Sequence, residues 1–73
     1  MSVPKFQQLA DHFRTKIRAG ELKPGEPLPS YSQLEEQGWK HTTIVRAMGE
    51  LRATGWTRHQ QGEGIFVADH PPV

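Results

Sequence analysis

The sequence predicts a small α+β domain of three helices followed by a β-hairpin, and three observations support this prediction. Two helical segments with glycines at their ends lie close together in the middle of the chain, at residues 30–38 and 41–55. An amphipathic helical segment precedes them, and two short β-prone runs joined by a glycine-rich turn follow them. Helices and a hairpin in this order predict a winged helix-turn-helix.

The first helix is predicted around an apolar stripe over residues 6–17, with Ser2 and Pro4 suited to its entrance. Its apolar residues recur three or four positions apart and therefore form one face: Phe6, Leu9, Ala10, Phe13 and Ile17. Gly20 suits the left-handed residue that follows a helix end. Three prolines within residues 24–29 exclude a helix there, so we expect a turn and a very short extended piece around Leu28.

The second helix is predicted to start at Ser30. Ser30 and Gln33 have the spacing of a capping box, in which each side chain bonds a backbone amide of the first turn. Leu34 is the main apolar anchor of this helix, and Gly38 ends it.

The third helix is expected from about His41 to Thr54, with Gly55 ending it and with Ile44, Ala47, Met48 and Leu51 on its buried face. Residues 56–59 and 65–68 are the predicted strands, and the five residues 60–64 connect them. We therefore expect one domain over residues 1–68, a flexible tail over residues 69–73, and no effector-binding domain.

Composition narrows the class of protein. The chain has 73 residues and no cysteine, about a third of it is apolar, and it contains neither a signal peptide nor a run long enough to cross a bilayer. We expect a cytoplasmic, nucleoid-associated protein with no membrane partner. The net charge is only +1, but residues 39–60 carry +3 while residues 1–38 are neutral and residues 61–73 carry −2. A solvated helix face accounts for so small an excess nearly as well as a phosphate-binding face.

The outer side of the third helix is the predicted reading surface. With the apolar residues buried, the helical period turns Thr42, Arg46 and Gly49 outward, flanked by Thr43 and Val45. Arginine bonds guanine or phosphate through two hydrogen bonds, threonine reaches base edges, and a valine methyl suits the thymine methyl. Gly49 allows close approach of the backbone.

Phosphate contacts are expected at two further places. Lys40 and His41 lie at the start of the third helix, where free amides and the helix dipole favour an anion. The hairpin is the candidate wing, with Arg58 and His59 at its base, although Glu63 opposes close approach to phosphate. With the start of the second helix, the predicted DNA-binding set is Ser30, Tyr31, Lys40, His41, Thr42, Thr43, Val45, Arg46, Arg58, His59, Gln60, Gln61 and Gly62.

Catalysis and metal binding are not expected. The four histidines are far apart and lack the spacing of metal ligands, and no set of nucleophile, base and orienting residue is recognisable. We expect no enzyme activity, no cofactor and no metal. Trp56, and with less force Trp39, are expected in the core.

From Phe6 to Val67 the chain resembles the DNA-binding domain of the GntR family of bacterial transcription regulators. The matching residues are Gln8-Leu9-Ala10, Ile17-Arg18-Ala19-Gly20-Glu21-Leu22, Pro24-Gly25, Leu28-Pro29-Ser30, Leu34, Gly38, Thr43-Ile44, Ala47-Met48, Leu51, Gly55, Gly62-x-Gly64 and Phe66-Val67. The resemblance implies binding of an operator in double-stranded DNA, usually a palindrome bound by a dimer, with the third helix in the major groove and the wing toward the minor groove.

The chain departs from the family pattern on the predicted reading surface. The segment up to Gly38 is one residue shorter than usual, and Lys40-His41 replaces the family's Ser-Arg. Val45-Arg46 stands in place of the family's frequent Arg-Arg or Arg-x before alanine, so two of the usual arginine contacts are missing. The family's C-terminal effector and dimerisation domain does not follow Val67 in this sequence. Unless the chain is a fragment of a longer protein, we expect no small-molecule effector and either a monomer or a DNA-assisted homodimer. Two hypotheses remain: a sequence-specific DNA-binding regulator, acting as a repressor, or a protein-interaction module that pairs with a full-length relative.

Overall fold

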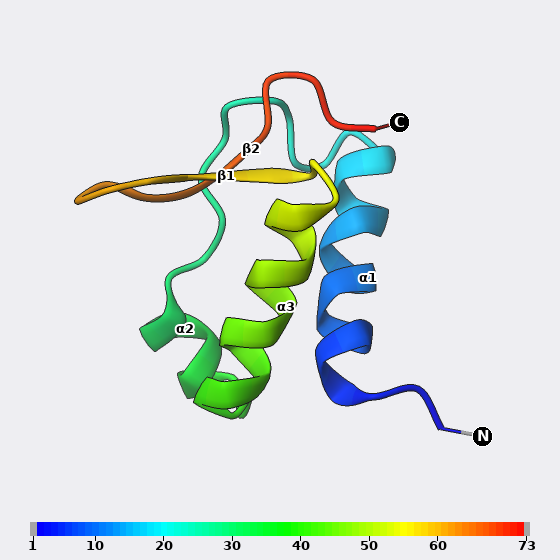
Figure 1. Cartoon of the computed structure of the whole chain (residues 1–73), viewed down its shortest axis with the longest axis vertical. Coiled ribbons are helices and arrows are strands. Elements are labelled where there is room, and N and C mark those ends of the chain that lie inside the picture. Colours follow the sequence, from blue (N-terminus) through cyan, green and yellow to red (C-terminus); the bar gives the residue numbers. More distant parts are fainter. Residues whose placement is uncertain (1, 73) are drawn as a thin grey trace.

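The computed structural model describes residues 2–72, so Met1 of the predicted domain and Val73 of the predicted tail lie outside the described residues. Three helices are followed by a two-stranded antiparallel hairpin (Figure 1). The elements are α1 (Lys5–Arg18), α2 (Tyr31–Glu36), α3 (His41–Ala53), β1 (Thr57–Gln60) and β2 (Gly64–Val67). The predicted winged helix-turn-helix is confirmed.

The core lies between α1 and α3, which pack side by side along most of their length (Figure 1). The apolar faces predicted for both helices are buried, and Leu28, Leu34, Trp56 and Val67 close the core from the remaining elements. Trp56 is 5% exposed, as expected of a core residue, whereas Trp39 is only half-buried against the core. Twelve apolar residues are buried within residues 2–72, and they hold the fold without a disulfide, since the chain has no cysteine.

All three helices end at the glycine that the sequence predicted, and α3 shows how. Gly55 has a φ of +84°, a conformation that costs a residue with a Cβ atom. Its N–H donates to the Arg52 carbonyl (3.2 Å), and the N–H of Trp56 donates to the Leu51 carbonyl (2.9 Å). These two bonds form a Schellman motif, which satisfies the last carbonyls of α3 and turns the chain toward β1.

The predicted capping box at the start of α2 is present. The Ser30 Oγ accepts from the Gln33 N–H (3.1 Å), and the Gln33 Oε1 accepts from the Ser30 N–H (2.8 Å). α3 begins at His41 as predicted, although Lys40 at its N-cap makes no side-chain capping bond. The amides at the start of α3 therefore have no capping side chain among the described residues.

The predicted hairpin has the right place and the wrong boundaries. Each strand is shifted by one residue, because Gln60 pairs with Gly64 and extends the ladder toward the tip. The connection is therefore three residues, 61–63, rather than five. Trp56 does not enter β1, because its amide is used by the Schellman motif of α3.

The short extended piece predicted around Leu28 forms no strand, only an isolated bridge between Pro27 and Phe66. It nevertheless lies along the free edge of β2. The Leu28 N–H donates to the Ile65 carbonyl (2.9 Å), and the Val67 N–H donates to the Glu26 carbonyl (2.8 Å). The pairing ends at Glu26, because its own N–H donates to the Lys23 carbonyl (3.0 Å) and the Gly25 N–H takes the Val67 carbonyl (3.0 Å).

Candidate nucleic-acid interface

The start of α2 and the hairpin project on the same side of the molecule, with α3 between them and the core (Figure 1). A cavity of about 720 Å³ lies between these two projections. Of the predicted DNA-binding residues, it brings together Ser30, Tyr31, His59, Gln60, Gln61 and Gly62. Two segments that are far apart in the chain thus share one concave surface. The sequence alone did not predict that they lie together.

Arg52 lines the same cavity and was not among the predicted site residues. It lies in the last turn of α3 and its side chain is exposed. Arg52 follows Val45 by seven residues, or two helical turns, so the two residues share one side of α3. This seven-residue spacing is the sequence signal that could have identified Arg52 as a site residue.

His59 reaches the cavity from β1. Partial burial, and after it the positive charge of Arg52, hold the pKa of this imidazole below its usual value. Both effects disfavour the protonated form in the free protein. A phosphate group brought into the cavity would act in the opposite direction and favour the imidazolium.

The outer face of α3 is open to solvent. Thr42, Val45, Arg46 and Gly49 are all exposed, and Val45 is one of the two large apolar side chains that the described residues expose, at 44%. The Arg46 guanidinium lies 4.2 Å from the centre of the Phe6 ring, a cation–π contact with the first turn of α1. The aromatic ring thus holds the arginine at one border of the exposed face.

The single acidic residue of α3 lies away from that face. Glu50 is directed toward α1, where its Oε1 lies 3.6 Å from the Arg14 Nη2. Asp11 of α1 also contacts Arg14, at 2.7 Å. The negative charge of Glu50 is thus balanced by an arginine of α1. The outer face of α3 consists of Thr42, Val45, Arg46 and Gly49. It therefore carries the positive charge of Arg46 and no carboxylate.

The predicted residues at the start of α3 fall on two sides. Lys40 and half-buried Thr43 line a separate hollow beside Lys5 and Trp39, on the α1 side of the helix. His41 lies on the α2 side: its ring meets the Tyr31 ring edge-on at 5.8 Å between centres.

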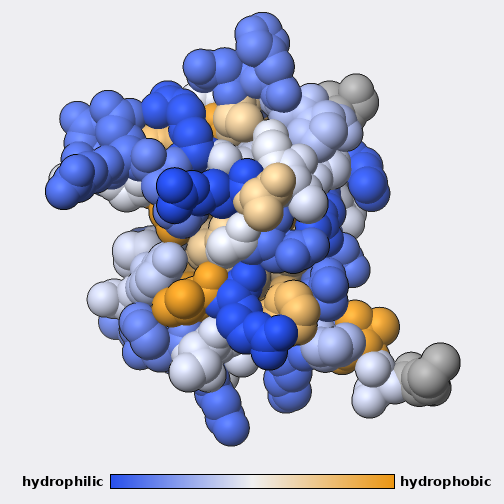
Figure 2. Space-filling model, viewed as in Figure 1, coloured by the Kyte–Doolittle hydropathy of each residue, from blue (hydrophilic) through white to orange (hydrophobic). Residues whose placement is uncertain are grey.

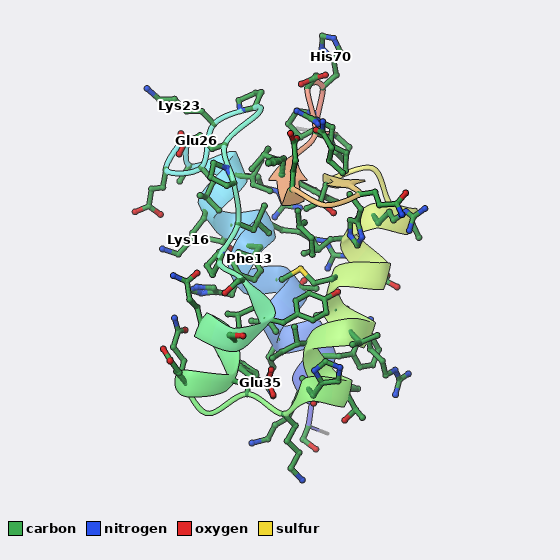
Figure 3. The ribbon with its side chains drawn as sticks, turned by 90° about the vertical axis from the view of Figure 1, so that its left-hand side faces the viewer. Phe13, Lys16, Lys23, Glu26, Glu35 and His70 are labelled. Carbon is green, nitrogen blue, oxygen red and sulfur yellow. The ribbon has the colours of Figure 1, made fainter. Side chains whose placement is uncertain are left out.

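The His41 Nδ1 also lies 3.7 Å from the Glu35 Oε2, an ion pair when the imidazole is protonated. Figure 3 shows Glu35 at the end of α2 beside the start of α3. The contact therefore joins the two helices of the helix-turn-helix. His70 of the tail lies at the opposite end of the molecule (Figure 3).

Arg58 does not line the cavity that holds its neighbour His59. Its guanidinium lies over the Phe66 ring, 5.2 Å from the centre, and donates to the Gln60 Oε1 (2.7 Å). Asp69 approaches it at 3.9 Å. The tip of the hairpin is hydrophilic on the face shown in Figure 2.

Neither a metal centre nor a membrane span emerges within residues 2–72. The described histidine, aspartate and glutamate side chains form no group of three that could bind a metal ion. Within the same residues, every helix is too short or too polar to cross a bilayer.

Comparison with known proteins gives matches over nearly the whole chain. The model of the family described as bacterial regulatory proteins, gntR family, matches residues 5–67. The arabinose metabolism transcriptional repressor of Geobacillus stearothermophilus is 33% identical over 72 residues, which are 97% of this chain and 20% of that protein. The mannosyl-D-glycerate transport/metabolism system repressor MngR of Escherichia coli K12 is 37% identical over 67 residues, 90% of this chain and 28% of that protein.

A solved structure extends the similarity to the backbone. The crystal structure of AraR(DBD) in complex with operator ORR3 has a TM-score of 0.87 and 32% identity, over 93% of this chain and 83% of that chain. The chain spans only 20% of the length of the first curated repressor and 28% of the second. The matched family model covers all three helices and both strands, and the chain belongs to the gntR family of bacterial regulatory proteins.

Proposed function

We propose that this chain binds double-stranded DNA sequence-specifically, with the outer face of α3 in the major groove and the hairpin toward the minor groove. The observation that carries the proposal is the similarity to AraR(DBD) bound to its operator, which matches 93% of the chain at 32% identity. Together with membership of the gntR family and the repressor names of its relatives, this makes the chain a DNA-binding transcriptional regulator. These matches do not favour the protein-interaction module.

The structure supports this use of the surface in three ways. α3 exposes hydrogen-bonding and apolar groups suited to base edges, its one carboxylate lies toward α1, and a cavity between α2 and the hairpin carries Arg52 and His59. Residues 1–68 would form the binding unit. We further propose that two copies assemble on a palindromic operator, which would give half-sites separated by whole turns of the duplex. A DNA ligand would place the protein on the nucleoid.

The test is selection of bound sites from random duplex DNA, followed by affinity measurements across salt concentrations. Each phosphate that the protein neutralises adds about −0.9 to the slope of log affinity against log salt, so several phosphate contacts give a steep decline between about 50 and 200 mM. A palindromic selected site bound by two chains supports the dimer. A flat salt profile would refute DNA binding.

Two arginines provide a matched pair of variants. Arg46 stacks on Phe6 beside the outer face of α3, and Arg18 stacks on Trp56 at 5.3 Å, at the end of α1. We expect Arg46→Ala to weaken binding to the selected site by roughly tenfold or more, because it removes a charge-assisted hydrogen bond. Arg18→Ala loses the same charge and the same kind of stacking, and we expect it to bind nearly as the unmodified chain does.

A further inference from the structure

Gly49 lies in the middle of α3 at a position where the fold does not require glycine. Six of the seven glycines have a positive φ and lie at turns, at helix ends or at the first residue of β2, whereas Gly49 has ordinary helical geometry. In a helix interior, glycine is the least favourable residue after proline. The chain therefore carries a destabilising residue at the centre of the exposed face of α3.

Internal packing does not explain this glycine. A Cβ atom built at Gly49 meets no atom within 4 Å beyond the adjoining backbone of its own helix, so alanine fits without displacing any neighbour. Residues Ala47, Met48 and Leu51 of the same helix face the core, and Gly49 is exposed. The space left by the missing side chain thus opens outward, on the surface and not in the interior.

The position of Gly49 relates it to the two arginines of this face. Arg46 precedes it by three residues and Arg52 follows it by three, so both lie one turn away. Among residues 2–72, no carboxylate lies within ion-pair distance of either guanidinium. Gly49 is consequently a bare stretch of helix backbone between two unpaired positive groups.

We propose that the backbone of α3 at Gly49 makes direct van der Waals contact with the DNA, and that this contact sets how deeply the helix enters the groove. The inference rests on the proposed function. A methyl group at this position would extend outward by one carbon–carbon bond, about 1.5 Å. Hydrogen bonds from a guanidinium need donor–acceptor distances of about 2.7–3.2 Å, so a helix held off by that amount loses them. Gly49 is thus an affinity- and specificity-determining residue that positions Arg46 and Arg52.

The experiment compares stability and DNA binding in Gly49→Ala. We expect the variant to melt roughly 4–8 °C higher, because alanine favours the helix, and to bind the selected duplex roughly tenfold more weakly or worse. The negative slope of log affinity against log salt should become shallower by about 0.9 for each phosphate that the variant no longer neutralises. Thr15→Ala, an exposed helix substitution on α1, is the control and should leave affinity and slope unchanged.

Each outcome decides the question. A Gly49→Ala chain that is more stable and binds more weakly supports the contact, and Gly49→Val should then bind more weakly still because its side chain is larger. If the unmodified chain binds DNA with a steep salt slope and Gly49→Ala binds equally well, the contact at Gly49 is refuted and the proposed function stands. If the unmodified chain shows no salt-dependent DNA binding, both proposals fall.

Discussion

The helix end at Gly55 allows a stability prediction that can be worked from backbone geometry alone. Gly49 and Gly55 lie within one segment of chain, and a Cβ atom at either meets nothing within 4 Å beyond the adjoining backbone. They differ only in conformation: Gly55 has a φ of +84° and Gly49 has a helical φ. Replacing each with alanine therefore isolates the backbone effect from any steric effect.

The two substitutions should change the free energy of unfolding in opposite directions. Gly55→Ala places a Cβ atom in the left-handed region, which costs about 1–2 kcal/mol. The chain can relieve that cost only by giving up the bonds of the Schellman motif, at 3.2 and 2.9 Å, so the loss is not avoided. Gly49→Ala should gain about 1 kcal/mol from helix propensity. The two variants should differ by about 2–3 kcal/mol.

Urea unfolding followed by tryptophan fluorescence and by circular dichroism measures this difference. Trp56 is buried and lies directly after Gly55, so its emission reports on the loss of the core. We expect equal m-values for all three proteins, since the exposed surface on unfolding does not change. A Gly55→Ala chain as stable as the unmodified one would refute the assignment of the helix end, and a destabilised Gly49→Ala would refute the open space at that position.

Three further predictions concern the capping box and the cavity. Ser30→Ala should lower the free energy of unfolding by about 1 kcal/mol in urea titrations, while Ser32→Ala in the same helix should have little effect. Arg52→Gln should make the negative slope of log affinity against log salt shallower by about 0.9. Lys23→Gln removes the same charge from the loop after α1 and should leave the slope unchanged. Equal slopes for the two variants would contradict a DNA contact in the cavity. His59 has a lowered pKa in the free protein, so near and below pH 6.5 the unfolded chain binds more protons and the folded protein loses stability as the pH falls. His59→Gln should flatten that pH dependence in thermal melts, and an unchanged profile would assign it to another group.

Local signals in the sequence determined the helices and their limits. Each of the three helices ends just before a glycine with a positive φ: Gly20, Gly38 and Gly55. Such a helix end depends only on residues a few positions away along the chain. The capping box of Ser30 and Gln33 is local for the same reason. The buried faces of α1 and α3 follow from their periodicity, which depends only on helical geometry.

The strand limits were less predictable because pairing partners, and not local residues, decide them. Gln60 enters β1 because Gly64 lies opposite to it, and Trp56 is excluded because α3 uses its amide. The segment around Leu28 reads as a strand by itself, but the edge of β2 and the turn over residues 23–26, which uses the Glu26 N–H, decide how much of it pairs.

The sequence by itself determined that this chain is a winged helix-turn-helix with a polar outer face on its third helix. Only the tertiary structure decided which of those polar residues act together. Arg52 joins His59 and Tyr31 in one cavity, Glu50 is directed to Arg14, and Arg58 lies away from the cavity. The physical reason is that helix ends and amphipathic faces depend on neighbours a few residues away, whereas a binding surface depends on how separate elements are oriented when the shared core packs.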